Sequence, residues 1–247
     1  RWAFPENFAS RLKGAKVLNL KRRAKYILID LSTDETLLIH LGMSGKILVS
    51  GSKMGNYFYE LSKSKKHDHV IFLLSDGTVV TYNDPRRFGA MDLANTKDLN
   101  NHKFLKRLGP EPLGNDFNSY YLKKKLSKKE SPIKNVLLDQ SLVAGLGNIY
   151  VCEALFMSGI SPKKKAAKIS KNKCEELVKN IRTVLISAIE AGGSSLKDFT
   201  DIQGKSGYFQ FEFFVYGREK ESCKTINCDS KIKRVSQSGR SSFYCPS

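Results

Sequence analysis

The stretch of residues 142–162, LVAGLGNIYVCEALFMSGISP, most constrains what this chain can fold into. Its apolar start runs into a two-glycine turn, GLGN at 145–148, and a second apolar segment ends at the break SGISP. The two breaks in the apolar pattern predict a helix, a turn, a second helix and a second turn. Asn148 stands where helix amides and its own side-chain amide could hold an anion. An ordinary helical hairpin explains the same stretch equally well.

The charge of the chain indicates the kind of partner. Its formal net charge is +18, from 42 Lys and Arg against 24 Asp and Glu. Such an excess favours a polyanion, of which nucleic acid is the commonest. A membrane surface is another polyanion that would suit this charge, but no apolar run has the length of a spanning helix, and we expect no membrane partner. No signal or transit segment is visible, which predicts a reducing, intracellular setting.

The order of predicted elements indicates an α+β protein. Short segments rich in Val, Ile, Leu, Thr and Tyr predict six strands, at 16–20, 25–31, 36–41, 46–50, 69–74 and 78–82. Strands so closely spaced suggest a sandwich or a barrel. After the proline- and glycine-rich linker 108–114, the pattern predicts helices at 118–126, 134–140 and 171–191. A further strand is predicted at 211–216. We expect three domains, at 1–107, 108–209 and 210–247.

Three turns among the strands carry charged and apolar residues together. Lys25 lies in the basic segment 21–26, Met43 lies on a glycine-flanked turn, and DPRRFG places Arg86 and Phe88 on another turn. A basic cluster is commonly a solvated face, and an apolar loop residue commonly forms a small local core. Apolar tips beside arginines on rigid turns also suit a protein that inserts side chains between base pairs. The residues alone leave both interpretations open.

The cysteines fall into two groups. Cys152 and Cys174 lie in helical surroundings, where we expect reduced core thiols. The other three gather near the end of the chain, a pattern that favours a metal site over a disulfide framework: Cys223, Cys228 and Cys245.

The segment between these three cysteines predicts a β-hairpin, residues 231–244, turning around 237–240. A structural zinc ion takes four ligands, whereas three cysteines and no nearby histidine are present, and the chain stops two residues after Cys245. We expect a zinc site whose fourth ligand is missing from this sequence, with three unligated thiols as the alternative. A hairpin this small would depend on its metal.

Nine short motifs occur in order along the chain: RRAKY, HLGMSG, KHDHV, DPRRFG, LGPEPL, GLGNIY, GYF, VYGR and GRSSFYC. Together they resemble the bacterial formamidopyrimidine-DNA glycosylase family over nearly the whole length. The resemblance implies a β-sandwich domain, a helix–two-turn–helix domain and a C-terminal β-hairpin zinc finger around a DNA cleft. It implies a monomeric enzyme of the bacterial cytoplasm, associated with the nucleoid. That enzyme would excise 8-oxoguanine and formamidopyrimidines from duplex DNA and cut abasic sites by β- and δ-elimination.

The resemblance also implies roles at individual positions. Met43, Arg86 and Phe88 match the residues that fill the gap left when the damaged nucleotide flips out of the stack. Lys25 matches a lysine linked to β-elimination, and Arg240 matches the hairpin arginine linked to δ-elimination.

Further positions match residues that contact DNA. The first group binds DNA directly: His67, Arg86 and Lys129. The second group lies along the phosphates or beneath the lesion pocket: His40, Lys134 and Asn148. Residues 192–207 match the loop that closes over the flipped base.

The start of the chain departs from the family pattern. There the nucleophile is the amine of an N-terminal proline, which can form a Schiff base, and the glutamate after it acts as acid or base. Here the only nearby match is Pro5-Glu6, and the nitrogen of Pro5 is an amide that cannot attack a sugar. We therefore expect the N-terminal helix and its nucleophile to be missing from this sequence. The four-residue spacing of Cys223 and Cys228 also departs from the usual two.

Two alternatives come from other classes of protein. A non-catalytic zinc protein that reads DNA lesions or junctions would share the charge and the turns, and an RNA-binding zinc protein would share the charge. A paralogue acting on oxidised pyrimidines is a closer alternative. The residues that such a paralogue inserts into the base stack generally differ from Met43, Arg86 and Phe88, which we call the wedge residues.

Overall fold

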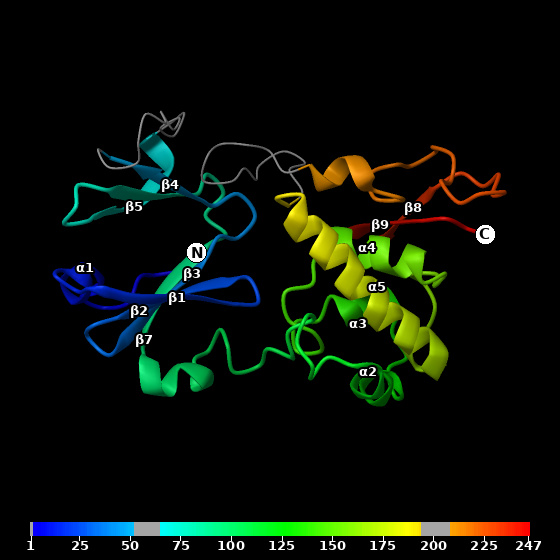
Figure 1. The fold of residues 1–247 in the computed structure, drawn as a ribbon, viewed down its shortest axis with the longest axis horizontal. Helices are drawn as coiled ribbons and strands as arrows, with labels where there is room; N and C mark the ends of the chain where they lie inside the picture. Colours follow the sequence, from blue (N-terminus) through cyan, green and yellow to red (C-terminus); the bar gives the residue numbers. More distant parts are fainter. Residues whose placement is uncertain (1, 52–64, 194–207) are drawn as a thin grey trace. The chain divides into compact units, whose positions relative to one another are not determined.

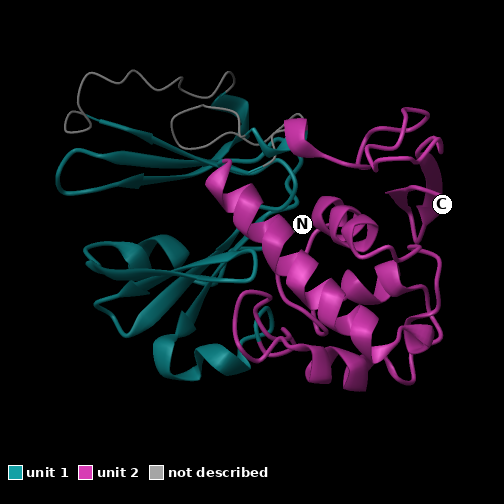
Figure 2. Ribbon diagram, turned by 45° about the vertical axis from the view of Figure 1, so that its right-hand side comes forward, with its two compact units in different colours: residues 1–105, 192–210 teal, residues 106–191, 211–247 magenta. Residues whose placement is uncertain are grey.

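The chain forms two compact units in the computed structural model, which describes residues 2–51, 65–193 and 208–247. Unit 1 comprises Arg1–Leu105 and Gly192–Gln210, and unit 2 comprises Lys106–Ala191 and Phe211–Ser247 (Figure 2). The division into three domains stays a prediction. Among the described residues, no helix combines the length and apolarity needed to cross a membrane.

Unit 1 is built on two antiparallel sheets (Figure 1). The first has the order β1-β2-β3-β7, with bounds Val17–Arg23, Tyr26–Leu31, Glu35–His40 and Ala90–Asn95. The second has the order β4-β6-β5, with bounds Lys46–Ser50, Val79–Asn83 and Asp68–Leu73. The predicted sandwich and all six predicted strands are confirmed, with ends shifted by at most three residues.

Strand β7 was missed by the sequence prediction. Its sequence, AMDLAN, contains residues with low strand propensity, and its pattern lacks alternation. It forms because β3 offers it a full partner edge, from Glu35 opposite Asn95 to His40 opposite Ala90. Four of its residues are buried, so tertiary burial outweighs local preference.

The core of unit 1 lies between the sheets. Its buried side chains come from both layers: Leu31, Leu37, Ile39, Tyr82, Met91 and Leu93. Leu37 and Ile39 alternate along β3 and therefore point to the same face. The short helix α1 (Phe8–Leu12) packs Phe8 and Leu12 against this cluster.

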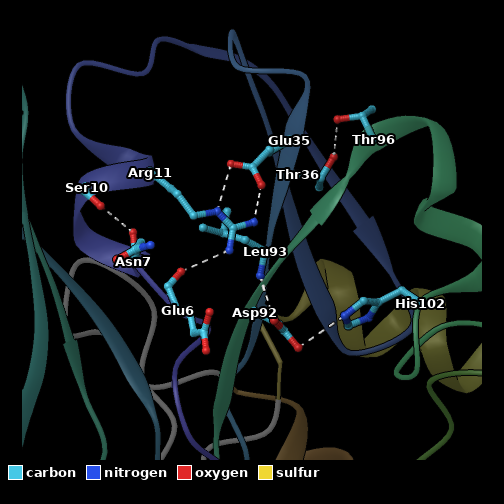
Figure 3. A network of polar contacts seen from close by, with 10 residues as sticks. All are labelled: Glu6, Asn7, Ser10, Arg11, Glu35, Thr36, Asp92, Leu93, Thr96 and His102. Carbon is cyan, nitrogen blue, oxygen red and sulfur yellow. Dashed lines mark hydrogen bonds and ion pairs between the residues drawn. The ribbon is translucent and has the colours of Figure 1, made fainter.

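Polar contacts hold the start of the chain and the end of β7 (Figure 3). The guanidinium of Arg11 in α1 donates to the carboxylate of Glu35 and to the carbonyl of Glu6, at 3.3 Å for the latter. The carboxylate of Asp92 contacts Nε2 of His102 at 3.3 Å and Nζ of Lys103 at 2.6 Å. The Pro5-Glu6 pair thus forms the entry to α1.

Unit 2 is helical up to the cysteine-rich hairpin. Its α-helices are α2 (Ser119–Leu126), α3 (Ile133–Leu137), α4 (Asn148–Met157) and α5 (Lys171–Glu190). The buried residues of α5 recur every three or four positions, and this face packs against α2 and α4. Short 3₁₀ turns complete both units, at Lys65–His67, Thr96–Asn101, Ala166–Lys168 and Phe209–Glu212.

The apolar residues before the two-glycine turn form turns, so the prediction of a helix there was wrong. Within residues 138–147 the side chain of Gln140 bonds to the backbone on both sides of the turn and adds to short main-chain bonds such as Leu142 N to Asp139 O. Its Nε2 donates to the carbonyls of Leu138 and Leu146, and its Oε1 accepts from Gly145 N at 2.9 Å. The predicted turn is confirmed at Gly145, whose φ of 81° favours glycine.

The predicted strand at 211–216 is also wrong, and the reason is Glu153 of α4. Its side chain is almost fully buried, at 1% exposure, and accepts three successive main-chain N–H groups. The donors are Phe214, Val215 and Tyr216, at 2.8 to 3.1 Å. Successive amides that converge on one anion cannot also alternate as a strand requires.

The hairpin itself is confirmed as β8 (Lys233–Gln237) and β9 (Arg240–Tyr244). Its two-residue loop has positive φ at both Ser238 and Gly239, as a type I′ turn needs. Phe243 of β9 packs with Cys152 of α4, Val215 and Ile232 in a small buried cluster. The hairpin therefore has a core that it shares with α4.

We predict that Glu153→Gln destabilises unit 2 by about 2–4 kcal/mol, because an amide leaves buried N–H donors without an acceptor. Urea unfolding measures the loss, and hydrogen exchange should accelerate at the amides of residues 214–216. The exposed Glu175 of α5 provides a matched control, since Glu175→Gln removes a charge from the same unit without breaking these bonds. Equal unfolding free energies for the two variants would contradict the prediction.

Candidate nucleic-acid interface

Two chain crossings lie side by side at one end of the unit 1 sandwich. Residues 41–45 lead from β3 to β4, and residues 84–89 lead from β6 back to β7. The registers place the crossings together, because His40 pairs with Ala90 and Lys46 pairs with Asn83. Each crossing therefore passes between the same two sheets, in opposite directions.

The predicted wedge residues are carried on these two crossings. Met43 is 54% exposed, Arg86 is exposed and Phe88 is half-buried. The guanidinium carbon of Arg86 lies 4.9 Å from the centre of the Phe88 ring, a cation–π distance. The structure thus brings Met43, Arg86 and Phe88 to one end of unit 1.

Backbone packing joins the two crossings. At Gly42, a Cβ atom would lie 2.6 Å from both Gly89 N and Phe88 C, so any larger residue would separate the turns. Gly42 also has a φ of 68°, which side chains disfavour.

Beneath the tips lies a buried carboxylate that sequence reasoning passed over. Asp84 has no exposed surface, and its Oδ1 accepts from Ser44 Oγ at 2.7 Å. Its Oδ2 accepts from Gly89 N at 2.8 Å and from Tyr82 OH at 3.1 Å. Burial by itself raises the pKa of Asp84, but these hydrogen bonds outweigh it and hold the pKa below its usual value. The carboxylate is therefore charged at neutral pH.

The other predicted residues of unit 1 lie at the same end. Lys25 is exposed in the turn between β1 and β2, next to Tyr26, which pairs with His40. His67 is joined to the second crossing, because its carbonyl accepts from Asp84 N at 3.0 Å. All predicted site residues of unit 1 are thus gathered around the two crossings.

His40 is placed to act as a neutral ring. Burial is the main cause of its lowered pKa, and the charge of Lys25 contributes. Its Nδ1 accepts a hydrogen bond from Gly42 N at 3.1 Å, which requires that nitrogen to carry no proton. His40 therefore supports the turn that carries Met43.

In unit 2, Lys134 and Asn148 both bind the hairpin immediately after Arg240. Nζ of Lys134 donates to Ser241 O at 2.9 Å and to Ser242 Oγ at 2.6 Å. Nδ2 of Asn148 donates to the same Ser241 carbonyl at 3.0 Å. The backbone beside Arg240 is held by two donors, while the Arg240 side chain is exposed.

Burial separates the roles of the predicted basic residues in unit 2. Lys134 has no exposed surface, and burial is the main cause of its lowered pKa. Lys129 is exposed in the turn after α2, where its carbonyl accepts from Ala167 N at 2.9 Å. The structure brings Lys134 and Asn148 together at the carbonyl that follows Arg240, and it joins the backbone of Lys129 to residue Ala167 in the lysine-bearing segment 163–168.

The three predicted metal ligands converge at the base of the hairpin. The sulfurs of Cys223, Cys228 and Cys245 all lie within 4.8 Å of one another, and those of Cys228 and Cys245 are 3.6 Å apart. Cys223 and Cys245 pack against the buried cluster around Phe243. This group of thiols could hold a metal ion.

One predicted element lies outside the described residues. The loop at 192–207 was expected to close over a flipped base, and its residues 194–207 are not among those that the structure describes.

Sequence reasoning missed several residues that organise this site: Ser44, Asp84, Glu153 and Tyr216. Asp84 stands inside the DPRRFG motif, in which the two arginines and the aromatic ring are the clearer signals of DNA binding. Glu153 is the one acidic residue within the apolar sequence of α4, and a charge in such a place signals a buried partner. Ser44 carries no comparable signal, and neither does Tyr216, whose hydroxyl accepts from Nδ2 of Asn148 at 3.3 Å.

Together, a β-sandwich unit with exposed basic and apolar turns and a helical unit with a cysteine-bearing hairpin define the class of DNA-repair proteins that carry such a helical domain. The sequence matches the Formamidopyrimidine-DNA glycosylase N-terminal domain over residues 1–91 and the Formamidopyrimidine-DNA glycosylase H2TH domain over residues 108–200. The chain belongs to the formamidopyrimidine-DNA glycosylase family.

Individual relatives agree with this assignment. The formamidopyrimidine-DNA glycosylase of Ruegeria pomeroyi is 57% identical over 245 residues, covering 99% of this chain and 87% of the relative. That of Dinoroseobacter shibae is 54% identical over 248 residues, again covering 87% of the relative.

Solved structures of the same family share the fold. Lactococcus lactis Fpg, in complex with DNA containing an abasic site, has a TM-score of 0.84 and 34% identity, covering 98% of this chain and 84% of that one. The MutM (Fpg) protein of Thermus thermophilus has a TM-score of 0.84 and 33% identity, covering 98% and 85%. The family is one of base-excision repair enzymes that act on damaged DNA, and a non-catalytic reader is not favoured.

Proposed function

We propose that this protein removes oxidised purines, such as 8-oxoguanine and formamidopyrimidines, from duplex DNA and then cleaves the abasic strand by β- and δ-elimination. The observation that carries the proposal is the pair of joined crossings in unit 1, which presents Met43, Arg86 and Phe88 from one rigid end of the sandwich. Related proteins have been solved with DNA containing Fapy-dG or an abasic site, which supports the same substrate class here.

The wedge answers a physical difficulty in this reaction. An enzyme cannot reach the glycosidic bond of a stacked base, so the nucleotide must leave the duplex at a cost of a few kcal/mol. We propose that Met43 and Phe88 replace the lost stacking contacts with apolar surface. Arg86 would pair through its guanidinium with the base left opposite the gap.

The basic residues divide between contacts and support. We propose that Lys25 assists β-elimination, that Arg240 assists δ-elimination, and that both bind phosphates. Further phosphate contacts come from His67 and Lys129. Lys134 and Asn148 act from below by holding the Ser241 carbonyl, so that Arg240 projects from a fixed backbone. His40 supports the Met43 turn.

The elimination chemistry needs an amine nucleophile. By family resemblance, this is an N-terminal proline that attacks C1′ of the sugar and forms a Schiff base. Pro5 cannot serve, since its nitrogen is an amide and its carbonyl begins the α1 turn. Activity experiments therefore use the full gene product, because the curated relatives extend beyond the part that this chain matches.

The three clustered thiols suit a zinc ion. In a tetrahedral site with Zn–S bonds near 2.3 Å, neighbouring sulfurs are roughly 3.8 Å apart. The 3.6 Å between Cys228 and Cys245 agrees with that spacing. We propose that one structural zinc ion binds Cys223, Cys228 and Cys245 and stabilises the hairpin, with its fourth ligand outside this set. The protein would act as a monomer in the cytoplasm, on nucleoid DNA.

We predict that the full gene product releases 8-oxoguanine from a duplex and leaves a gap with phosphates on both sides. Phe88→Ala should weaken binding to lesion duplex by about tenfold or more, because the filling of the gap is lost, and should leave binding to undamaged duplex nearly unchanged. Gel electrophoresis and fluorescence anisotropy measure these effects. Tight lesion binding without base release would contradict the proposed function, and equal loss on both duplexes would contradict the wedge.

The salt dependence of binding provides a second prediction. If Lys25, His67, Lys129 and Arg240 each meet a phosphate, while Arg86 meets the base opposite the gap, log affinity against log salt should have a slope of about −3 to −4. Lys129→Ala should reduce the magnitude of the slope by about one. A slope near zero, measured by anisotropy over a salt series, would contradict this interface.

A third prediction concerns the metal. We expect one zinc ion per chain by mass spectrometry of the native protein, and loss of that ion in Cys245→Ser, because a thiolate ligand is removed. Cys174→Ala serves as the control, since Cys174 is buried in α5 and is not one of the three clustered cysteines. Full zinc content in Cys245→Ser would rule out the assigned site.

A further inference from the structure

The two crossings of unit 1 are joined by more than their proximity. Ser44 lies in the first crossing and Asp84 begins the second, and their side chains meet in a buried hydrogen bond. Ser44 Oγ also accepts from Arg86 N at 3.3 Å, so a single hydroxyl contacts both Asp84 and the backbone of a wedge residue. The carboxylate takes its remaining bonds from Gly89, on the far side of Phe88, and from Tyr82 in β6.

The contacts of Asp84 enclose the loop that carries Arg86 and Phe88. Its side chain binds Gly89 N at one end of the loop, and its carbonyl accepts from Arg87 N at 3.2 Å in the middle. The same carbonyl lies 2.9 Å from Nε2 of His69 in β5. Arg87 has a φ of 55°, a conformation that costs energy in a non-glycine residue and needs surrounding bonds to hold it.

The buried bonds and the exposed tips therefore have separate tasks. Asp84 and Ser44 are 0% and 6% exposed, so DNA cannot reach them, whereas Met43 and Arg86 are exposed. Side chains carried on two separate turns can enter a duplex together only if the distance between the turns stays fixed during insertion.

We propose that Asp84, acting through Ser44 and Gly89, is a positioning residue that locks the two turns into a single preformed wedge. It acts through Arg86, Phe88 and Met43 and does not touch the substrate. The inference rests on the proposed function, since it assumes that these three side chains enter the gap in the duplex.

Asp84→Asn tests the proposal because it keeps the shape of the side chain. An amide presents only one acceptor oxygen, so an NH₂ group then faces either Ser44 on one side or Gly89 and Tyr82 on the other, where the carboxylate had offered an acceptor to both. Ser44→Ala is the second variant: it removes one hydroxyl from a small side chain and keeps the test open if Asp84→Asn does not fold. Asp92→Asn is the matched control, because Asp92 is also a buried carboxylate of this sandwich, and its side chain binds Leu93, His102 and Lys103, which lie outside both crossings.

The experiment measures wedge insertion with the full gene product. A 2-aminopurine base placed beside the lesion becomes fluorescent when the stack is opened, and stopped-flow mixing gives the insertion rate. We expect Asp84→Asn and Ser44→Ala to slow insertion by about tenfold or more, since small misplacements have effects of this size or larger. Asp92→Asn should insert at the wild-type rate, even if its melting temperature falls as much as that of Asp84→Asn. Adding Phe88→Ala should cost much less in the Asp84→Asn background than in wild type, because the ring is already misplaced.

Each outcome separates this inference from the proposed function. If wild type excises 8-oxoguanine but Asp84→Asn and Ser44→Ala insert at the wild-type rate, the positioning role is overturned and the proposed function stands. Slowing by the same factor in Asp92→Asn also overturns the positioning role, because general loss of stability then explains the effect. If wild type neither opens the stack nor excises the base, the proposed function fails and this inference fails with it.

Discussion

The proposed DNA-binding role of unit 1 depends on the buried hydrogen bonds between the two sheet crossings. A sandwich can be stable with many connections at its ends, but here the segments that follow β3 and β6 pass between the sheets in opposite directions and contact each other. Asp84 places a charge in that contact, where only full hydrogen bonding makes burial tolerable. The bonds it accepts fix two turns whose exposed tips combine apolar surface with a guanidinium.

Unit 2 uses the same device for a different element. Glu153 accepts three main-chain amides, and Lys134 and Asn148 both donate to the carbonyl after Arg240. Buried polar side chains thus fix the conformation of irregular backbone segments. These segments lack the repeated main-chain hydrogen bonds that fix a sheet or a helix. In both units the residues proposed to meet DNA are exposed or half-buried, and Asp84 and Lys134, which support them, are fully buried.

Much of this fold could be predicted from local pattern. The six strands, the long α5 helix, the hairpin turn and the cysteine group all follow from periodicity, turn residues and spacing. The failures share a cause that lies outside the local sequence. Strand β7 exists because β3 needs a partner, the 211–216 segment bends because Glu153 binds its amides, and the turns before Gly145 form because Gln140 holds them. The role of Asp84 was missed for the same reason, since its partner Ser44 is 40 positions away.

A crystal structure of the full gene product bound to a duplex with an abasic site tests the central claim most directly. The account predicts that Met43, Arg86 and Phe88 occupy the gap in the stack, with the Ser44–Asp84–Gly89 hydrogen bonds unchanged from those described here. A duplex whose gap is filled by other residues, or bound away from this end of the sandwich, would contradict it.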